Sequence, residues 1–153
     1  MTRRFTLLAP LALMACASSA AAATLEVVKT PSCGCCAVWV ERMKAAGFTV
    51  KVRDVEDTTP VAKAAGVPDR MRSCHTAKIG GYVIEGHVPA ADIRRLLAHK
   101  PKAVGLSVPG MPVGSPGMEM GGRVDRYHTV LIQADGKHKV WATHGGSADA
   151  HVH

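Results

Sequence analysis

The chain has 153 residues, 47% of them hydrophobic, so it is long enough and apolar enough to bury one core with an appendage. Its 19 Lys and Arg residues outnumber its 12 Asp and Glu residues, and the net charge is +7. The basic residues are scattered and aromatic residues make up only 4% of the chain, which excludes nucleic acid as an expected partner.

The first 23 residues have the pattern of an export signal. A basic "MTRR" precedes the apolar run "FTLLAPLALMA", and "AAA" at residues 21–23 supplies a small-residue cleavage site. The apolar run is shorter than the roughly 20 residues that a membrane-spanning helix needs. We therefore expect an exported protein. Cys16 ends a loose lipoprotein box, so membrane association is expected only if Cys16 is lipidated.

A strand and a helix are expected on either side of a cysteine loop. The β-branched run "TLEVVK" at residues 24–29 predicts the strand. Three cysteines then fall within four residues, and the helical spacing that follows predicts a helix that begins at or just after Cys36 and stops at Gly47. In this helix we expect Trp39 to face away from the stripe formed by Cys36 and Val40, with a packing role favoured over a cover for the cysteine loop.

A second strand and a second helix follow. The segment "FTVKVRD" at residues 48–54 alternates between apolar and polar residues, which predicts a half-buried strand with Phe48, Val50 and Val52 on its inner face. The segment "TTPVAKAAG" at residues 58–66 begins with a capping residue and proline and ends with glycine, and this pattern predicts a short helix.

A hairpin and a third helix come next. The segments "TAKI" and "YVIEGHV" predict two strands, joined by Gly80-Gly81 in a two-residue turn that is typical of tight hairpins. The segment "PAADIRRLLAHKP" predicts a helix between its two prolines. The order over residues 24–100 is therefore β-α-β-α-β-β-α, which predicts an α/β fold of the thioredoxin-like kind.

The composition changes after Lys102. Glycine, proline and methionine dominate residues 105–122, which predicts a Met/Gly/Pro-rich loop. A second hairpin is expected at residues 127–143. We assign residues 24–144 to one thioredoxin-like domain and residues 145–153 to a disordered tail.

The cysteines have a specific place in such a fold. A C-x-x-C pair lies between the first strand and the first helix of a thioredoxin-like domain, which is the spacing of Cys33 and Cys36, and Cys35 adds a third thiol. A helix N-terminus favours thiolates, which attack disulfides and bind soft metals. Cys74 precedes the third strand, at the position that faces the C-x-x-C loop. A fourth thiol is therefore expected to point at the first three.

Three chemical interpretations of the four cysteines remain. Four cysteines in an exported protein normally form two disulfides, but a second bridge in this tight loop would force strain. A thiol-disulfide oxidoreductase would use Cys33 as the nucleophile and Cys36 as the resolving thiol, so enzymatic activity stays an open question. A thiophilic metal site would use all four thiols. We favour the metal site, because a redox enzyme does not need four convergent thiols.

Three stretches carry a resemblance to a known family. They are "TPSCGCCAVWVERMKAAGFTVKV", "GVPDRMRSCHTAKIGGYVIEGHVPAADIRRLL" and "GLSVPGMPVGSPGMEMGG". They resemble the periplasmic copper-resistance family called CopG, which is distinct from the ribbon-helix-helix repressor of that name. The resemblance implies a thioredoxin-like fold, a copper(I)–thiolate site that can hold several ions, and a periplasmic role in handling excess copper. The residues that match the family's cysteines are Cys33, Cys35, Cys36 and Cys74.

Copper(I) is the expected metal, and zinc is the less favoured alternative. Zinc takes four sulfur or nitrogen ligands, which Cys33, Cys36, Cys74 and His75 could supply. That set would leave Cys35 as a spare thiolate, whereas thiolates can bridge several copper(I) ions. We therefore predict that the protein acts in copper resistance by sequestration or redox handling of copper.

Other soft side chains supply candidate secondary ligands. His75 follows Cys74 directly, and the loop carries Met111, Met118 and Met120, whose thioethers copper(I) accepts. The alternative for the methionines is that they fill gaps in packing. Further histidines are candidates for scavenging copper(II) from solvent: His138, His144, His151 and His153.

A copper carrier is the remaining hypothesis. The loop at residues 105–122 would then dock on other periplasmic copper-handling proteins and pass copper to them. The expected partners are therefore copper ions and such proteins.

Overall fold

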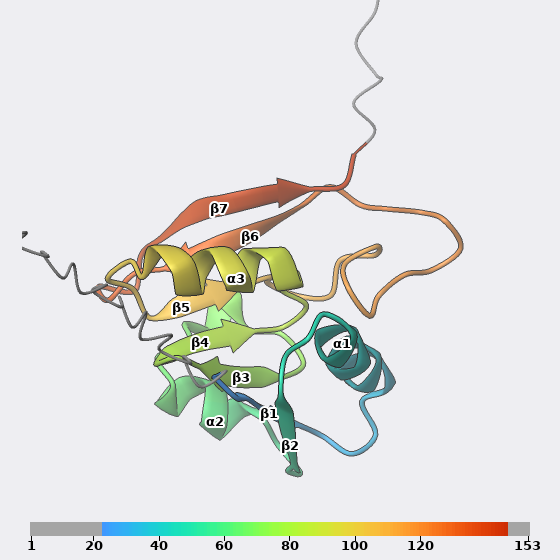
Figure 1. Ribbon diagram of the computed structural model, residues 1–153, viewed down its shortest axis with the longest axis horizontal. Coiled ribbons are helices and arrows are strands. Elements are labelled where there is room, and N and C mark those ends of the chain that lie inside the picture. The colour runs from blue at the N-terminus through green and yellow to red at the C-terminus, as the bar shows by residue number, and fades with distance from the viewer. Residues whose placement is uncertain (1–22, 147–153) are drawn as a thin grey trace, which may run out of the picture.

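Seven strands form one sheet in the computed structural model, which describes residues 23–146 (Figure 1). The strands are β1 (Leu25–Lys29), β2 (Val50–Asp54), β3 (Thr76–Ile79), β4 (Tyr82–Glu85), β5 (Gly105–Ser107), β6 (Tyr127–Ile132) and β7 (His138–His144). Their order across the sheet is β2-β1-β3-β4-β5-β6-β7. The expected export signal up to residue 22, including Cys16, and the tail from residue 147 lie outside the described residues.

Four helical segments accompany the sheet. They are α1 (Gly34–Ala45), α2 (Thr59–Ala64), the single 3-10 turn η1 (Asp69–Met71) and α3 (Ala90–His99). The observed order β1-α1-β2-α2-β3-β4-α3 agrees with the predicted one, and the predicted α/β class is confirmed. Within residues 23–146, no helix has the length and apolar character that crossing a bilayer requires.

The strand directions divide the sheet into two parts. Strands β1 and β2 run parallel, while β3 runs antiparallel to both β1 and β4, and these are the four strands that the sequence predicted within residues 24–100. Strand β5 runs parallel to β4 and connects this part to the antiparallel β6–β7 hairpin. The first three residues of the expected loop therefore form a buried strand. Three residues are too few to show a strand pattern in sequence.

Apolar side chains cover both faces of the sheet. Trp39, Met43 and Ile93 from α1 and α3 pack in one cluster with Ile84 of β4. The neighbouring Val83 points to the other face, where a second cluster includes residues of α2 and η1. This separation follows from the two-residue period of a strand, which places successive side chains on opposite faces.

Strand β2 is more exposed than its alternating pattern predicts. It lies at the edge of the sheet, four of its five residues are exposed, and Val52 keeps 44% of its surface accessible. The alternation correctly indicated a strand. The strand is more exposed than predicted because an edge strand has a neighbouring strand on one side only. The charged residues along β2 suit this place, because they oppose pairing with a further strand.

The β3–β4 hairpin turns at Gly80 and Gly81 with φ values of +55° and +84°, so both residues adopt the left-handed conformation that a tight hairpin requires. The register pairs Ile79 with Tyr82 and Thr76 with Glu85. In this antiparallel register, the residue one position earlier in β3 pairs with the residue one position later in β4. The amide of Gly86 also donates a hydrogen bond to the carbonyl of His75, so the pairing continues beyond the strands.

Candidate metal centre

The cysteine loop leads directly into α1, which begins at Gly34. The sequence placed this start at or just after Cys36, so the prediction was two residues late. Cys33 is the N-cap, in an extended conformation, and Cys35 and Cys36 lie in the first helical turn. The spacing of apolar residues could not show this start, because a helix can begin before its first buried side chain. All three sulfurs are therefore carried at the positive end of the helix dipole.

Cys33 and Cys36 form a disulfide, with a sequence separation of three and 5.3 Å between their Cα atoms. Cys35 and Cys74 are free thiols. Cys36 is fully buried, whereas Cys33 is half-buried. The structure therefore differs from the alternative in which the four cysteines form two disulfides. The cysteines form one disulfide and keep two thiols.

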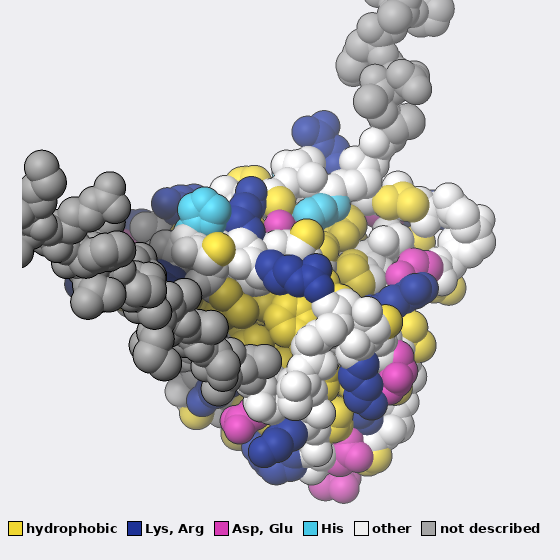
Figure 2. All heavy atoms as spheres, viewed as in Figure 1, with side chains coloured by type: hydrophobic (Ala, Val, Ile, Leu, Met, Phe, Trp, Pro, Cys, Tyr) yellow, Lys and Arg dark blue, Asp and Glu magenta, His cyan; other side chains and the backbone are white. Residues whose placement is uncertain are grey.

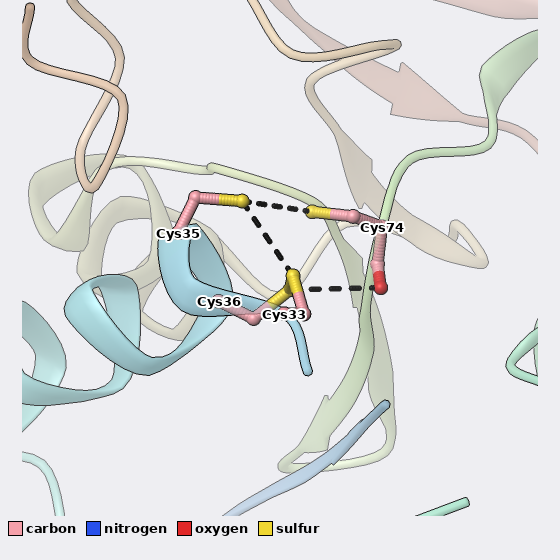
Figure 3. Close-up of side chains that lie close together, drawn as sticks. All are labelled: Cys33, Cys35, Cys36 and Cys74. Atoms are coloured by element: carbon pink, nitrogen blue, oxygen red, sulfur yellow. Dashed lines mark hydrogen bonds between the residues drawn. A yellow bond between two sulfur atoms is a disulfide. The ribbon is translucent and has the colours of Figure 1, made fainter. Parts of the chain in front are cut away.

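All four sulfurs lie close together (Figure 3). The Sγ of Cys35 is 3.5 Å from the Sγ of Cys33 and 4.0 Å from the Sγ of Cys74. Cys36 is joined to Cys33 by the disulfide, and its Sγ lies 3.6 Å from the carbonyl oxygen of Cys74. The structure therefore brings the distant Cys74 against the three cysteines of the loop, as its position before the third strand predicted.

Two buried histidines lie on the far side of Cys74. His75 Nδ1 is 3.4 Å from the Cys74 Sγ, and His87 Nε2 is 3.1 Å from the same sulfur. Both imidazole rings are completely inaccessible to solvent, and they meet edge to face with 5.1 Å between their centroids. His75 was a predicted candidate. His87 was not singled out, because a lone histidine after a strand is usually solvated.

The protonation pattern of His87 follows from its second contact. Its Nδ1 lies 2.8 Å from the carbonyl oxygen of Pro116, and a carbonyl can only accept a hydrogen bond. Nδ1 therefore carries the proton, and in the neutral ring Nε2 holds a lone pair that faces Cys74. His75 differs, because its Nε2 is buried without a hydrogen-bond partner among the described residues.

Burial keeps this group of side chains uncharged. Desolvation, followed by the neighbouring Cys35 sulfur, raises the pKa of Cys74 to about 12. Desolvation, with a smaller contribution from His87, lowers the pKa of His75 to about 3. Desolvation also lowers the pKa of His87. At neutral pH the metal-free group therefore consists of a thiol and two neutral imidazoles.

Glu85 holds the segment that carries Cys74. The amide of Ser73 donates to Glu85 Oε1 at 2.8 Å, and the hydroxyl of Thr76 donates to Glu85 Oε2 at 2.7 Å. The carboxyl group is buried, and desolvation raises its pKa. One oxygen thus holds the Ser73 backbone and the other holds the Thr76 side chain, so that Glu85 is bonded on either side of Cys74 and His75. This arrangement limits how far Cys74 and His75, which lie between Ser73 and Thr76, can move.

Residues 115–119, which we call the strap, lie against the first turns of α1. Gly117 has a φ of +88°, and a Cβ at this position would come within 2.8 Å of the Cys35 carbonyl oxygen and 2.9 Å of the Trp39 amide nitrogen. Only glycine fits such a close approach to the helix backbone. In Figure 1 the orange loop that contains the strap lies on the same side of the sheet as α1. The strap thereby places the Pro116 carbonyl beside His87.

The methionines of the loop are mostly exposed. Met111 keeps 53% of its surface accessible and Met120 keeps 61%, while Met118 is half-buried. Met111 and Met120 therefore do not fill gaps in the core.

Trp39 corrects an expectation, because it does not face away from Cys36 and Val40 but is fully buried with them. Its Nε1 donates to the Val88 carbonyl at 3.0 Å, and its ring packs on His75 with 4.4 Å between the centroids.

The other histidine candidates lie elsewhere. His144 Nε2 is 2.8 Å from the Asp92 carboxylate and 3.0 Å from the Thr129 hydroxyl, so it connects β7 to α3 and β6. His138 is exposed at the start of β7. His151 and His153 lie outside the described residues. Figure 2 shows histidine side chains separated from one another on the surface of one face.

Within residues 23–146, two groups of side chains have potential metal ligands within 4.8 Å of one another. One group consists of Cys33, Cys35, Cys36 and Cys74. The other consists of Cys74, His75 and His87. Cys74 is common to both, so its sulfur lies where the two groups meet.

Comparisons with known proteins found one family model and two similar structures. A family model described as "Protein of unknown function, DUF411" matches residues 71–118. Two solved structures are similar over 80% of this chain and 98% of their own, and both are described as "Copper resistance protein copG". Form 2 has 44% identity and a TM-score of 0.77, and Form 1 has 46% identity and a TM-score of 0.76. No curated protein sequence matches the chain.

Proposed function

The chain belongs to the CopG family of copper-resistance proteins, and on this premise we propose that it binds copper(I) through its four clustered cysteines. The observation that carries the proposal is the convergence of Cys74 on the three sulfurs of the loop. Soft thiolates select copper(I) over harder cations, and the start of α1 favours the thiolate form. Copper(I) is therefore the cargo that this donor set suits best.

Binding by all four cysteines requires reduction of the Cys33–Cys36 disulfide. A dithiol reductant supplies two electrons and two protons, which break the sulfur–sulfur bond and leave two thiols. Each thiol then releases its proton when its sulfur binds copper(I). The disulfide is thus the oxidised state of the site, and the half-buried Cys33 is the sulfur that a reductant reaches.

A multinuclear copper site accounts for the number of sulfurs. Sulfurs 3.5 and 4.0 Å apart are close enough to share metal ions as bridging thiolates. A single zinc ion held by Cys33, Cys36, Cys74 and His75 would leave Cys35 unused beside it. We therefore favour copper(I) over zinc, and a role in copper resistance by sequestration or redox handling of the ion. The amino-terminal export pattern supports a periplasmic location for this role.

Anaerobic titration of the reduced protein with copper(I) tests the proposal. We expect several ions per chain and absorption from thiolate-to-copper charge transfer, and Cys35→Ser should lower the number bound. Ser32→Ala is the matched control, because Ser32 is an exposed neighbour of the same loop. Binding of one zinc ion without a preference for copper(I) would contradict the proposal.

A thiol-disulfide oxidoreductase is the second candidate, and the Cys33–Cys36 disulfide at the start of α1 favours it. The Cys33 thiolate would attack a substrate disulfide, form a mixed disulfide and release one substrate thiolate. Cys36 would then attack Cys33, restore the protein disulfide and release the second thiolate. Turnover should then survive Cys35→Ser and Cys74→Ser, both of which should lower copper(I) stoichiometry if the metal proposal holds.

A further inference from the structure

The structure shows the centre with two of its four cysteine sulfurs joined to each other. In this state Cys33 and Cys36 have no thiol to offer, and a four-thiolate site cannot form. Cys74, His75 and His87 are unaffected by the disulfide, because none of their donor atoms takes part in it. The oxidised protein therefore keeps a second set of ligands.

We propose that Cys74, His75 and His87 form a metal position of their own, which holds one copper ion while Cys33 and Cys36 remain joined as a disulfide. The identity of the metal rests on the proposed function, whereas the position itself rests on the geometry of the three side chains. In the reduced protein the Cys74 sulfur also belongs to the four-cysteine site. Reduction of the disulfide thus changes the ligands that the centre presents, from one sulfur and two nitrogens to four sulfurs.

The distances between the three donors fit a metal ion. An ion bound tetrahedrally at about 2.3 Å from sulfur and about 2.0 Å from nitrogen keeps those two ligand atoms about 3.5 Å apart. His75 Nδ1 lies 3.4 Å from the Cys74 Sγ, and His87 Nε2 lies 3.1 Å from it. Both sulfur–nitrogen distances therefore lie within half an ångström of the separation that such an ion requires.

The hydrogen bond of His87 to the backbone favours a ligand role for this residue. The Pro116 carbonyl holds the proton of His87 on Nδ1, so that the Nε2 lone pair points at the shared sulfur. A metal-bound histidine usually has this kind of partner on its other nitrogen. His75 is fully buried, and its Nε2 has no partner among the described residues. His75 thus lacks the second hydrogen bond that His87 has, and its place in the set rests on the distance from its Nδ1 to the Cys74 sulfur.

The chemistry of the set suits copper in two oxidation states. Imidazole binds both copper(I) and copper(II), as it also binds zinc, whereas a cluster of thiolates selects copper(I). One thiolate with two imidazoles is therefore less selective for oxidation state than four thiolates. The free Cys35 Sγ lies 4.0 Å from the Cys74 Sγ, outside the three-residue group.

The disulfide form of the mature chain isolates this position without any substitution. Cobalt(II) is the probe, because it exchanges no electrons with the disulfide and reports thiolate and imidazole ligands by its absorption. We expect one cobalt(II) ion per chain with a thiolate charge-transfer band, and its displacement by one equivalent of copper(I) without oxygen. Failure of the disulfide form to bind cobalt(II) or copper(I) overturns the inference, even if the reduced form binds several copper(I) ions.

The opposite result separates the two proposals. If the reduced protein binds no more ions than the disulfide form, the four-cysteine proposal fails and the three-residue position stands. Retention of cobalt(II) in the presence of copper(I) would refute copper as the metal of this position.

A variant and its control locate the ion. His87→Gln should weaken cobalt(II) binding to the disulfide form at least about tenfold. His128→Gln is the matched control, because His128 is exposed on β6 and its ring contacts Thr143. Equal binding by both variants would show that His87 is not a ligand and would refute the inference.

If His87→Gln does not fold, nitrogen NMR of the unmodified protein identifies the histidines that bind the ion. Diamagnetic zinc(II) then replaces cobalt(II) as the probe. We expect the side-chain resonances of His87 Nε2 and His75 Nδ1 to shift on binding, while those of His128 stay in place. Unchanged resonances of His75 and His87 in the zinc-bound disulfide form would contradict the assignment.

Discussion

Cys74 and His87 lie side by side beyond the ends of β3 and β4, with 3.1 Å between Sγ and Nε2. Because the Nδ1–H of His87 donates a hydrogen bond to the Pro116 carbonyl, Nε2 holds a lone pair, and the Cys74 thiol donates to that lone pair. Burial keeps the proton on the sulfur, since it raises the pKa of Cys74 to about 12. A metal ion must displace that proton before the sulfur can bind it.

The first prediction concerns the reactivity of the two free thiols in the disulfide form. A thiol with a pKa of about 12 has only about one molecule in ten thousand ionised at pH 8. Since the thiolate is the reactive species, Cys74 should alkylate much more slowly than Cys35. Mass spectrometry after timed alkylation measures both rates. In the reduced protein, copper(I) should protect all four cysteines together, and a Cys74 rate that copper(I) does not change would show that Cys74 is not a ligand.

The second prediction concerns the strap. Gly117→Ala would place a Cβ against the α1 backbone and strain a φ of +88°, so we expect the strap to move and the protein to lose about 1–3 kcal/mol of stability. Displacement of the Pro116 carbonyl should also weaken metal binding by the disulfide form. Gly121→Ala is the control, because Gly121 also has positive φ, at +56°, but no atom lies within 4 Å of its Cβ position. Equal effects of the two changes on metal affinity, measured by titration, would contradict the role of the strap.

The third prediction concerns the loop methionines. Replacement of Met111, Met118 and Met120 together by Leu should slow the transfer of copper(I) to a chelator or acceptor protein, because the thioethers at the surface would no longer receive the ion. The number of copper(I) ions bound should stay the same. Stopped-flow transfer kinetics measure the effect, and Met43→Leu in the core is the control. Unchanged kinetics in the triple variant would exclude a relay through these side chains.

The fourth prediction concerns acid stability. Burial lowers the pKa of His75 to about 3, whereas in the unfolded chain it returns to about 6.5. The unfolded state therefore binds a proton that the folded state refuses, and folding stability should fall as the pH drops from about 6.5 towards about 3. His75→Gln removes this titration and should show a smaller loss. Urea unfolding of the metal-free protein at pH 7 and pH 4 compares the two, and parallel losses would assign the acid sensitivity to other groups.

Much of the centre could be predicted from the sequence, because two of its parts are local. The cysteine loop is encoded by a strand, three cysteines and a helix within about twenty residues of chain. The place of Cys74 followed from the order of elements alone. His87 could also have been found, since a two-residue turn at Gly80-Gly81 sets the register and brings position 87 opposite position 74.

The remaining parts depend on contacts between distant segments. The Pro116 carbonyl is a backbone group, so no residue type marks its hydrogen bond to His87. Gly117 looked like one more glycine of a flexible loop, although its contact with α1 demands glycine. The burial of Trp39 reflects the helix start at Gly34 and the packing of His75, which the helical pattern did not reveal.

The donors of the centre come from two stretches of chain that differ in how they can be inherited. The segment at residues 71–118, which the family model matches, contains Cys74, His75, His87 and Pro116. The three-cysteine loop lies well outside it. A match to this segment alone therefore says nothing about the three-cysteine loop. Whether a relative can form the four-sulfur site depends on the residues that it carries at the positions of Cys33, Cys35 and Cys36.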